Sequence, residues 1–470
     1  MADLQLLTDD QMRQFIVNGY VLVRPGLDAS LHESVFAETE AVFEKEGNPG
    51  NNLVPRIPAV QQVLDSPEVR GGLTSILGEG YYTQPHRHCH FNPPGSQGQH
   101  LHQDGSSRWS HRTRRILLFY YPQDTPEELG PTAVVPGSHF YATREGVDSF
   151  PELPLCGQAG TVAIVHYDLF HRATPNRTDR NRYMMKFLFA RTAEPRSPSW
   201  KNDGPGWPAD GSALDLDPSG GPDRRMYEHV WDWHRGRTAN GAAEDGPAGA
   251  ADSTERVAGL LAGMEDGCEG ARLRAAYALS GAGSAAAPGL ARLLHADSQE
   301  LRRNACHALS AMGEAAVGPL IEALQGGAAE HERAEAAETL GDIGLAAQPA
   351  VPALTARLRD ESDQVRAQAA EALGTIGQTD SAAGPALAEA LGDESGSVRR
   401  NAAFALVQLG PHGEAAVPAL GDVLHDEDRY VRGDAAQALL RIGTPRALET
   451  VLPFLETSRW CPLTTKESTY

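Results

Sequence analysis

The stretch that decides the fold of the first half of the chain reads GTVAIVH and covers residues 160–166. An apolar run between a glycine and a histidine predicts a buried strand. His171 follows this strand, and Arg182 opens the next predicted strand, Tyr183–Ala190. We expect the two strands to pair as antiparallel neighbours, since a connection of about ten residues permits it, which would bring Arg182 beside His171.

Outward from this stretch, the first 235 residues combine short predicted strands with turn signals. Near the start, Thr8 and Gln11 have the spacing of a capping box, and Asn18-Gly19 ends the helix that they begin. Several short strands joined by long irregular connections favour a β-sandwich or jelly roll (a double-stranded β-helix) over βαβ units. The predicted strands are Tyr20–Val23, Arg115–Tyr121, Ala133–Val135, Thr161–His166 and Tyr183–Ala190.

The second half of the chain is an internal repeat rich in Ala, Leu, Glu and Gly. Four copies of a Leu…Gly pattern end at glycines spaced 33 residues apart, and two looser copies end at Gly283 and Gly313. A proline near the start of one predicted helix and a glycine after the end of the other match the usual asymmetry of helix termini. Each helix pair can bury its apolar face only against its neighbours, so an α-solenoid is expected. The glycines of the four copies are Gly344, Gly377, Gly410 and Gly443.

A chain of 470 residues exceeds one ordinary hydrophobic core, so two domains are expected. We expect a first domain with the short strands at 1–235, a linker at 236–251 without large apolar residues, the solenoid at 252–455 and a tail at 456–470.

Charge and cysteine content narrow the classes of function. The net charge is −21, of which about −13 falls after residue 250, and no basic stripe suggests nucleic acid binding. Five scattered cysteines form no disulfide framework and no CxxC pair. Without a secretory signal at the start or an apolar run of membrane-spanning length, the expected compartment is the cytoplasm.

The pattern that carries chemistry is His102-Gln103-Asp104 together with His171. On an extended segment, side chains two residues apart point to the same side, so His102 and Asp104 can chelate one ion. Two imidazoles and one carboxylate form the facial triad that holds non-haem Fe(II) and leaves coordination positions open. Arg182 offers a planar, bidentate fork for the carboxylate of a co-substrate.

In these residues the first half resembles the phytanoyl-CoA dioxygenase family, over roughly 7–235. The resemblance also rests on a Pro-Gly-Ser-His segment ending at His139 and on the opening stretch from Leu7 to Val23. It implies His102, Asp104 and His171 as iron ligands, Arg182 as the anchor for the distal carboxylate of 2-oxoglutarate, and ascorbate as an optional reductant.

Two positions qualify this resemblance. Some members of the family use a hydroxyl two residues after the distal histidine to help hold 2-oxoglutarate, but this chain has Ala173 there, with Thr174 adjacent. Halogenating relatives have Gly or Ala in place of the carboxylate ligand, which frees a position for chloride. The resemblance, with Asp104 present, therefore implies hydroxylation.

The repeats resemble HEAT repeats, in a short Ala-rich form, over about 255–455. A repeat of this length also occurs in ankyrins, but their Thr-Pro-Leu-His signature is absent. Some HEAT-like proteins are iron hydroxylases with several His-Glu pairs as ligands, whereas the repeats of this chain contain only one such pair, His331-Glu332.

Further polar groups have open roles. His86, His88 and His90 would share one face of a strand, where they could line the pocket or simply pack, or, as an alternative, bind a second metal. His88 and His90 are the candidates for substrate contact. His100 is expected near the site or at the surface, and His139 is expected to pack in its turn. Three arginines could recognise an anionic substrate group or form solvated loop charge; they are Arg112, Arg114 and Arg115.

The sequence thus predicts an Fe(II)- and 2-oxoglutarate-dependent dioxygenase that hydroxylates a C–H bond of a small or medium organic substrate. The solenoid is expected to bind a protein partner or to support the oxygenase. Two alternatives stay open: a scaffold protein whose oxygenase domain is inactive, and a protein hydroxylase whose solenoid captures its substrate. Substrate specificity would rest on variable loops, here Ser138–Glu152 and Ser197–Pro222.

Overall fold

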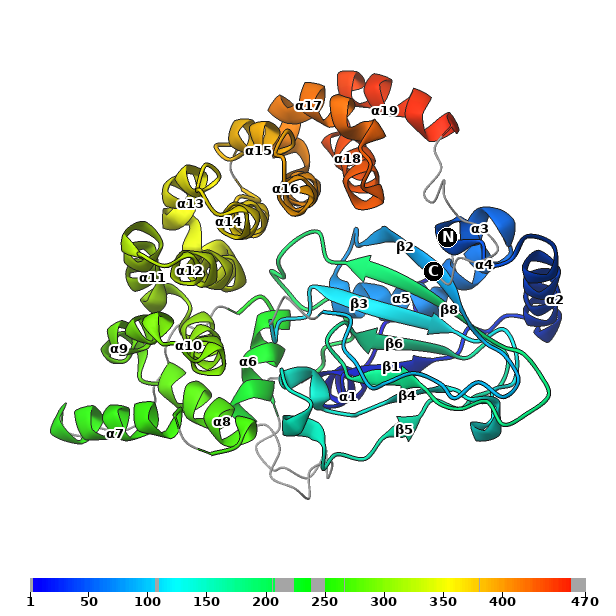
Figure 1. Ribbon diagram of the computed structural model, residues 1–470, viewed down its shortest axis with the longest axis horizontal. Coiled ribbons are helices and arrows are strands. Elements are labelled where there is room, and N and C mark those ends of the chain that lie inside the picture. Colours follow the sequence, from blue (N-terminus) through cyan, green and yellow to red (C-terminus); the bar gives the residue numbers. More distant parts are fainter. Residues whose placement is uncertain are drawn as a thin grey trace. The chain divides into compact units, whose positions relative to one another are not determined.

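The computed structural model describes residues 3–105, 110–204, 206–207, 224–237, 250–265, 267–379 and 381–457. Within them the chain forms two compact units (Figure 1). The first unit runs to Thr192 and resumes at Ser197; the second consists of Ala193–Arg196 and residues 224–457. Much of the loop Ser197–Pro222, the tail from residue 458 and residues 238–249 of the expected linker lie outside the described residues.

The first unit begins with the predicted capped helix. Helix α1 (Asp9–Asn18) starts after Thr8, whose side chain accepts from the Gln11 backbone while the Gln11 side chain accepts from the Thr8 backbone. The helix ends at Gly19, whose φ of 75° suits a residue without a Cβ. Strand β1 (Tyr20–Val23) follows directly. The capping box, the helix stop and this strand are therefore confirmed.

The larger sheet of the first unit has five strands in the order β1-β6-β3-β8-β2, all paired antiparallel. The expectation that the strand before His171 pairs with the strand that Arg182 opens is wrong, because β3 lies between them and pairs with both. Strands β6 and β8 therefore run in the same direction. The segment that connects them passes through the second sheet, as the strand His171–Ala173, before it returns. The strands are β2 (Tyr82–Asn92), β3 (Arg115–Tyr120), β6 (Val162–His166) and β8 (Arg182–Ala190).

The smaller sheet has three short strands in the order β5-β4-β7. They are β4 (Thr132–Val134), β5 (Leu153–Pro154) and β7 (His171–Ala173). A buried apolar cluster joins residues of both sheets, among them Leu117, Val134 and Met184. Two antiparallel sheets closed over one such core are the arrangement expected for a jelly roll.

Helices cover the outer face of the larger sheet. Helix α5 packs on β1 and β6, and a Cβ on its Gly72 would lie 2.7 Å from Ile164, so only glycine lets the helix approach this closely. Phe36 and Phe43 of α2 make edge-on ring contacts with Tyr183 of β8. The helices are α2 (Ala29–Glu46), α3 (Leu53–Arg56), α4 (Val60–Leu64) and α5 (Pro67–Leu77).

The second unit is a stack of helix pairs, as the repeat predicts. In Figure 1 helices α10, α12, α14, α16 and α18 form one layer of this unit, and the shorter helices between them form the other. The first layer comprises α10 (Gln299–Met312), α12 (Glu330–Ile343), α14 (Asp363–Ile376), α16 (Gly396–Leu409) and α18 (Arg429–Ile442). The second comprises α9 (Ala287–Arg292), α11 (Glu314–Gly326), α13 (Val351–Arg357), α15 (Gly384–Ala390) and α17 (Val417–Asp422). The remaining helices are α6 (Arg224–His234), α7 (Ala250–Gly263), α8 (Glu269–Ser280) and α19 (Pro445–Thr457).

The repeated glycines and arginines have distinct structural roles. Gly344, Gly410 and Gly443 end their helices with φ of 75°, 53° and 69°, in the region that disfavours side chains, whereas Gly377 has φ of −78°. The arginine at the fourth position of α10, α12, α14 and α16 donates to two backbone carbonyls of the turn before its helix. It also forms an ion pair with an acidic residue of the next repeat.

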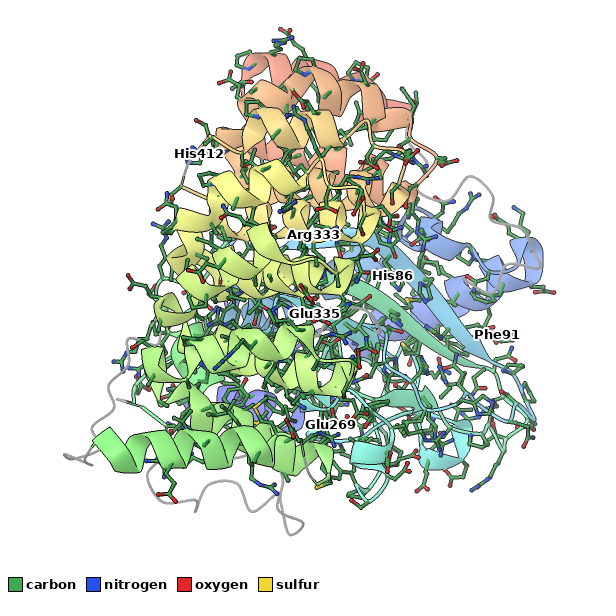
Figure 2. The ribbon with its side chains drawn as sticks, turned by 60° about the vertical axis from the view of Figure 1, so that its left-hand side comes forward. His86, Phe91, Glu269, Arg333, Glu335 and His412 are labelled. Atoms are coloured by element: carbon green, nitrogen blue, oxygen red, sulfur yellow. The ribbon has the colours of Figure 1, made fainter. Side chains whose placement is uncertain are left out.

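These ion pairs form a ladder along the solenoid, which we call the Arg–acid ladder. Arg333 of α12 donates to both carboxylate oxygens of Asp360, at 2.9 and 2.8 Å, and Glu335 of the same helix accepts from Arg302 (Figure 2). Helix α12 thus pairs with its neighbours in both directions. The further rungs are Arg366–Asp393 and Arg399–Asp426.

Among the described residues, no helix combines the length and the apolar character needed to cross a membrane.

Candidate metal and co-substrate site

The segment that carries His102 and Asp104 pairs with strand β7 through the backbone. The amide of His102 donates to the carbonyl of His171 at 3.1 Å, and the amide of His171 donates back at 2.9 Å. Between the two predicted ligands, Gln103 points the other way, and its amide donates to the carbonyls of Tyr141 and Asp168. This alternation explains the His-x-Asp spacing, because the middle residue anchors the segment while its neighbours face the interior.

The three predicted metal ligands converge. One atom from each of His102, Asp104 and His171 lies within 4.8 Å of the others, and this is the one such group of three among the described residues. Nε2 of His102 lies 3.8 Å from one carboxylate oxygen of Asp104, and Nε2 of His171 lies 4.0 Å from the other. Two atoms bound to one ion at about 2.1 Å each can be up to about 4.2 Å apart, so these two separations are within the reach of a single ion.

Both imidazoles are fixed with Nε2 facing the centre of the group. Nδ1 of His102 lies 2.8 Å from the His100 carbonyl, and Nδ1 of His171 lies 2.9 Å from the Leu169 carbonyl. A carbonyl only accepts, so each Nδ1 is the donor, and in the neutral ring this tautomer leaves Nε2 with a lone pair. Metal-binding histidines are oriented in this way by a hydrogen bond on the other ring nitrogen.

The charge states also suit a cation. Burial, with a smaller effect of Lys186, lowers the pKa of His171 to about 4, so this ring is neutral at neutral pH. Burial alone would raise the pKa of Asp104, but the charges and hydrogen bond around it, above all from Lys186, hold that pKa well below its usual range. The group therefore offers two imidazole nitrogens and one carboxylate, the donor set of a non-haem Fe(II) site. An iron ion fits these residues.

Arg182 lies at the start of β8, and its side chain is fully buried. Its Nε donates to the Gly130 carbonyl at 2.8 Å, and Nη1 donates weakly to the His90 carbonyl at 3.5 Å. Its Nη2 has no hydrogen-bond partner within the described part of the chain. A buried guanidinium nitrogen without an acceptor is costly, and a carboxylate is its best partner, so this residue fits the distal end of 2-oxoglutarate.

Lys186 is a residue of the site that the sequence reasoning missed. It lies on β8 four residues after Arg182, its side chain is 4% exposed, and its ammonium group forms a short ion pair with Asp104. The signal was present, because a lysine in the otherwise apolar strand RYMMKFLFA stands in phase with Arg182 on the alternating pattern.

The row of histidines lies on β2, as Figure 2 shows for His86. His88 is opposite Lys186 in the register of β2 and β8, and the Nε2 atoms of His88 and His90 lie 3.0 Å apart. Burial lowers the pKa of His90 well below its usual range. Within the described residues this row does not form a second group of three potential metal ligands, so the structure favours pocket lining over a second metal.

The remaining predicted positions have structural partners. His139 is buried and its Nε2 lies 3.0 Å from the Ile16 carbonyl, which confirms that it packs in its turn. The Thr174 hydroxyl donates to the Pro131 carbonyl at 2.7 Å, so it serves the loop backbone. The exposed His100 supplies the carbonyl that orients His102. Arg112 is buried, and Arg114 donates to the Ser110 hydroxyl at 3.3 Å.

A jelly roll in which two histidines and one carboxylate converge, with a buried arginine in the same unit of the chain, has the fold and the donor set expected of a non-haem iron oxygenase. Comparison with protein families gives the same class. The family model for phytanoyl-CoA dioxygenase matches residues 15–184, and the model for HEAT repeats matches 257–341, 317–403 and 384–461. The chain therefore carries a domain of the phytanoyl-CoA dioxygenase family followed by HEAT repeats.

Solved structures give more distant matches. The carbocyclase SnoK of nogalamycin biosynthesis, which is non-haem and alpha-ketoglutarate-dependent, is 21% identical with a TM-score of 0.34, over 40% of this chain and 85% of that one. The epimerase SnoN, in complex with Fe3+, alpha-ketoglutarate and nogalamycin RO, is 18% identical with a TM-score of 0.35, over 43% and 91%. The nickel complex of the non-haem monooxygenase ThoJ is 18% identical with a TM-score of 0.32, over 41% and 83%. A search of curated protein sequences finds no match.

Proposed function

We propose that this protein is an Fe(II)- and 2-oxoglutarate-dependent dioxygenase that hydroxylates a C–H bond of a small or medium organic substrate. The observation that carries the proposal is the convergence of His102, Asp104 and His171 around one point, with an unsatisfied nitrogen of Arg182 in the same domain. When bound, iron and 2-oxoglutarate would supply the oxidising chemistry, with succinate and carbon dioxide as products.

In this proposal the chain's own residues bind, orient and exclude water. His102, Asp104 and His171 would hold the metal through Nε2, a carboxylate oxygen and Nε2, with their rings fixed by backbone carbonyls. Arg182 would hold the distal carboxylate of 2-oxoglutarate. Phe119, whose ring centroid lies 5.7 Å from that of His171, adds an apolar wall that keeps water from the reacting centre.

The experiment is succinate formation from 2-oxoglutarate by the purified full chain with iron and ascorbate, compared with His102→Ala. We expect turnover by the wild type and loss of metal binding and turnover in the variant. A wild type that binds metal but forms no succinate, with or without a metabolite extract, would favour the alternative of a scaffold with an inactive oxygenase domain.

We propose that the domain boundaries follow the sequence prediction, with the oxygenase at 1–235 and the solenoid at 252–455. We also propose a reducing compartment such as the cytoplasm, which suits a ferrous site.

For the solenoid we propose partner binding or support of the oxygenase, because stacked helix pairs present an extended surface. Metabolite profiling decides between a hydroxylase of small molecules and a hydroxylase of a protein that the solenoid captures. A small molecule that gains one oxygen atom in step with succinate, with no other protein added, would count against a protein substrate captured by the solenoid.

A further inference from the structure

Strand β8 carries two buried cations on one face. Arg182 and Lys186 are four residues apart, so both side chains point to the interior of the jelly roll, with Met184 between them. Their Cα atoms are separated by about 13 Å along the strand, from about 3.3 Å per residue. Arg182 lies at the end next to Gly130, whereas Lys186 contacts Asp104. The strand thus places Lys186 next to the metal ligands and Arg182 farther from them.

Within the described residues, the ammonium group of Lys186 has fewer hydrogen-bond acceptors than it has donors. Its side chain is 4% exposed, and the carboxylate of Asp104 is its one hydrogen-bond acceptor among the described residues. An ammonium has three N–H donors, so two remain for other acceptors. The residues opposite Lys186 on the neighbouring strands are His88 and Phe119, and neither forms a hydrogen bond with it.

The charge balance of the site points in the same direction. With a ferrous ion and the 2-oxoglutarate dianion bound, as the proposed function requires, Asp104 and Arg182 already bring the site to neutrality. Lys186 then adds one positive charge, and its partner, the carboxylate of Asp104, would also be bound to the metal. A buried charge without a full partner is costly, so a group with negative charge is favoured beside it.

We propose that Lys186 is a carboxylate-binding residue of the site, which donates to a carboxylate placed next to the metal. Two sources share this chemistry: the carboxylate of 2-oxoglutarate at the metal end, and an acidic group on the substrate. The inference rests on the proposed function and deepens it, because it assigns a second anion contact on β8 and, through the second source, an acidic class of substrate.

The test compares Lys186→Met with Lys186→Arg, which keeps the charge, and with Lys45→Met, which removes an exposed lysine of α2. The full-length proteins are loaded with Co(II), a redox-inert reporter with visible absorption, and titrated with 2-oxoglutarate. Loss of one or two charge-assisted hydrogen bonds predicts a Kd for 2-oxoglutarate that rises about ten- to hundredfold in Lys186→Met. Lys186→Arg is expected to recover most of the affinity, and Lys45→Met to leave it unchanged.

The second source is tested on the complex with cobalt and 2-oxoglutarate. Hexanoate and benzoate are titrated against their methyl esters, with the cobalt spectrum as the readout. If the substrate supplies the carboxylate, the acids bind the wild type at least tenfold more tightly than the esters, and Lys186→Met removes this preference. The proposal is overturned if Lys186→Met leaves the 2-oxoglutarate affinity within twofold of wild type and the wild type shows no preference for either acid.

A further readout separates recognition from a purely structural role. The positive charge of Lys186 repels a cation, so Lys186→Met is expected to bind Co(II) at least as tightly as the wild type. If the variant instead loses cobalt affinity by more than tenfold, Lys186 acts by orienting Asp104, and the proposal is wrong. If the wild type itself binds neither cobalt nor 2-oxoglutarate, the proposed function fails, which is distinguishable from failure of this inference alone.

Discussion

Replacing Arg182 with methionine tests the co-substrate site most directly. The substitution keeps much of the side-chain volume but removes the guanidinium group, whose Nη2 has no partner in the described chain. Nε is already used by the Gly130 carbonyl, and Nη1 makes only a long contact with the His90 carbonyl. Two nitrogens are therefore available for a carboxylate, and the variant loses both.

Each hydrogen bond between charged groups contributes about 1.5–3 kcal/mol, and two that act on one carboxylate are not additive. We therefore take the lower end of this range, about 1.5 kcal/mol, for each of the two bonds, which gives about 3 kcal/mol for the pair. This corresponds to a rise of roughly 150-fold in the KM for 2-oxoglutarate. Arg182→Lys is expected to recover only part of this loss, because a lysine cannot form the two-pronged contact.

The assay measures succinate formation by the iron-loaded full chain as a function of 2-oxoglutarate concentration. Arg180→Met is the matched control, since Arg180 is exposed on the loop just before β8 and should leave the KM unchanged. Thermal unfolding checks that the buried variant is folded, because the Gly130 carbonyl loses one donor and keeps only that of Asn92. A folded Arg182→Met protein with a KM within twofold of wild type would refute the assignment.

Three further predictions follow from the same contacts. His102→Ala should lower Co(II) affinity by more than a hundredfold while thermal unfolding changes little, since His102 is partly exposed; retained affinity would contradict the assignment of the triad. Arg333→Met should lower the free energy of unfolding of the solenoid by about 2–3 kcal/mol, somewhat below the 3–5 kcal/mol for breaking a buried pair, because Asp360 keeps its ion pair with Arg357. Arg359→Met removes an ion pair whose arginine side chain is 80% exposed, and it should change the free energy of unfolding by less than about 0.5 kcal/mol. Equal effects of the two substitutions in chemical denaturation would contradict a stabilising role of the Arg–acid ladder. Burial lowers the pKa of His166 to about 3. As the pH falls below about 6.5, this histidine is therefore protonated in the unfolded chain but not in the folded one, and the free energy of unfolding decreases. Between pH 6.5 and 4 the loss from this group is about 3 kcal/mol, and His166→Asn should show a correspondingly shallower decline in urea denaturation; an unchanged slope would contradict it.

Much of the local structure could be predicted because it depends on neighbouring residues. The helix from Thr8 to Gly19 follows from a capping box and a glycine stop, and the strand Tyr20–Val23 has the predicted bounds. The repeat glycines likewise mark helix ends, since helix termination is a local event. The convergence of His102, Asp104 and His171 was predicted from side-chain types and from a family pattern, and the structure brings them together.

What could not be predicted depends on pairing between distant segments. The strand that Arg182 opens was expected to pair with residues 160–166, but β3 lies between them, because strand order in a sheet is not encoded by the length of one connection. The long strand Tyr82–Asn92 was not among the predicted strands, since its histidines and proline give no clear apolar alternation. Lys186 was missed for a related reason: a lysine within a strand usually marks an exposed position, and only the register with His88 and Phe119 shows that it faces inward.

The Arg–acid ladder has a mechanical consequence. Every rung joins two adjacent repeats through a side chain that also binds the backbone of its own turn, as Arg366 does with the Asp360 carbonyl and the Asp393 carboxylate. Bending the array at one joint therefore strains a hydrogen-bonded turn as well as a side-chain contact. The stack should flex as an evenly stiff spring rather than at a single hinge, with deformation shared among all the repeats that the rungs connect.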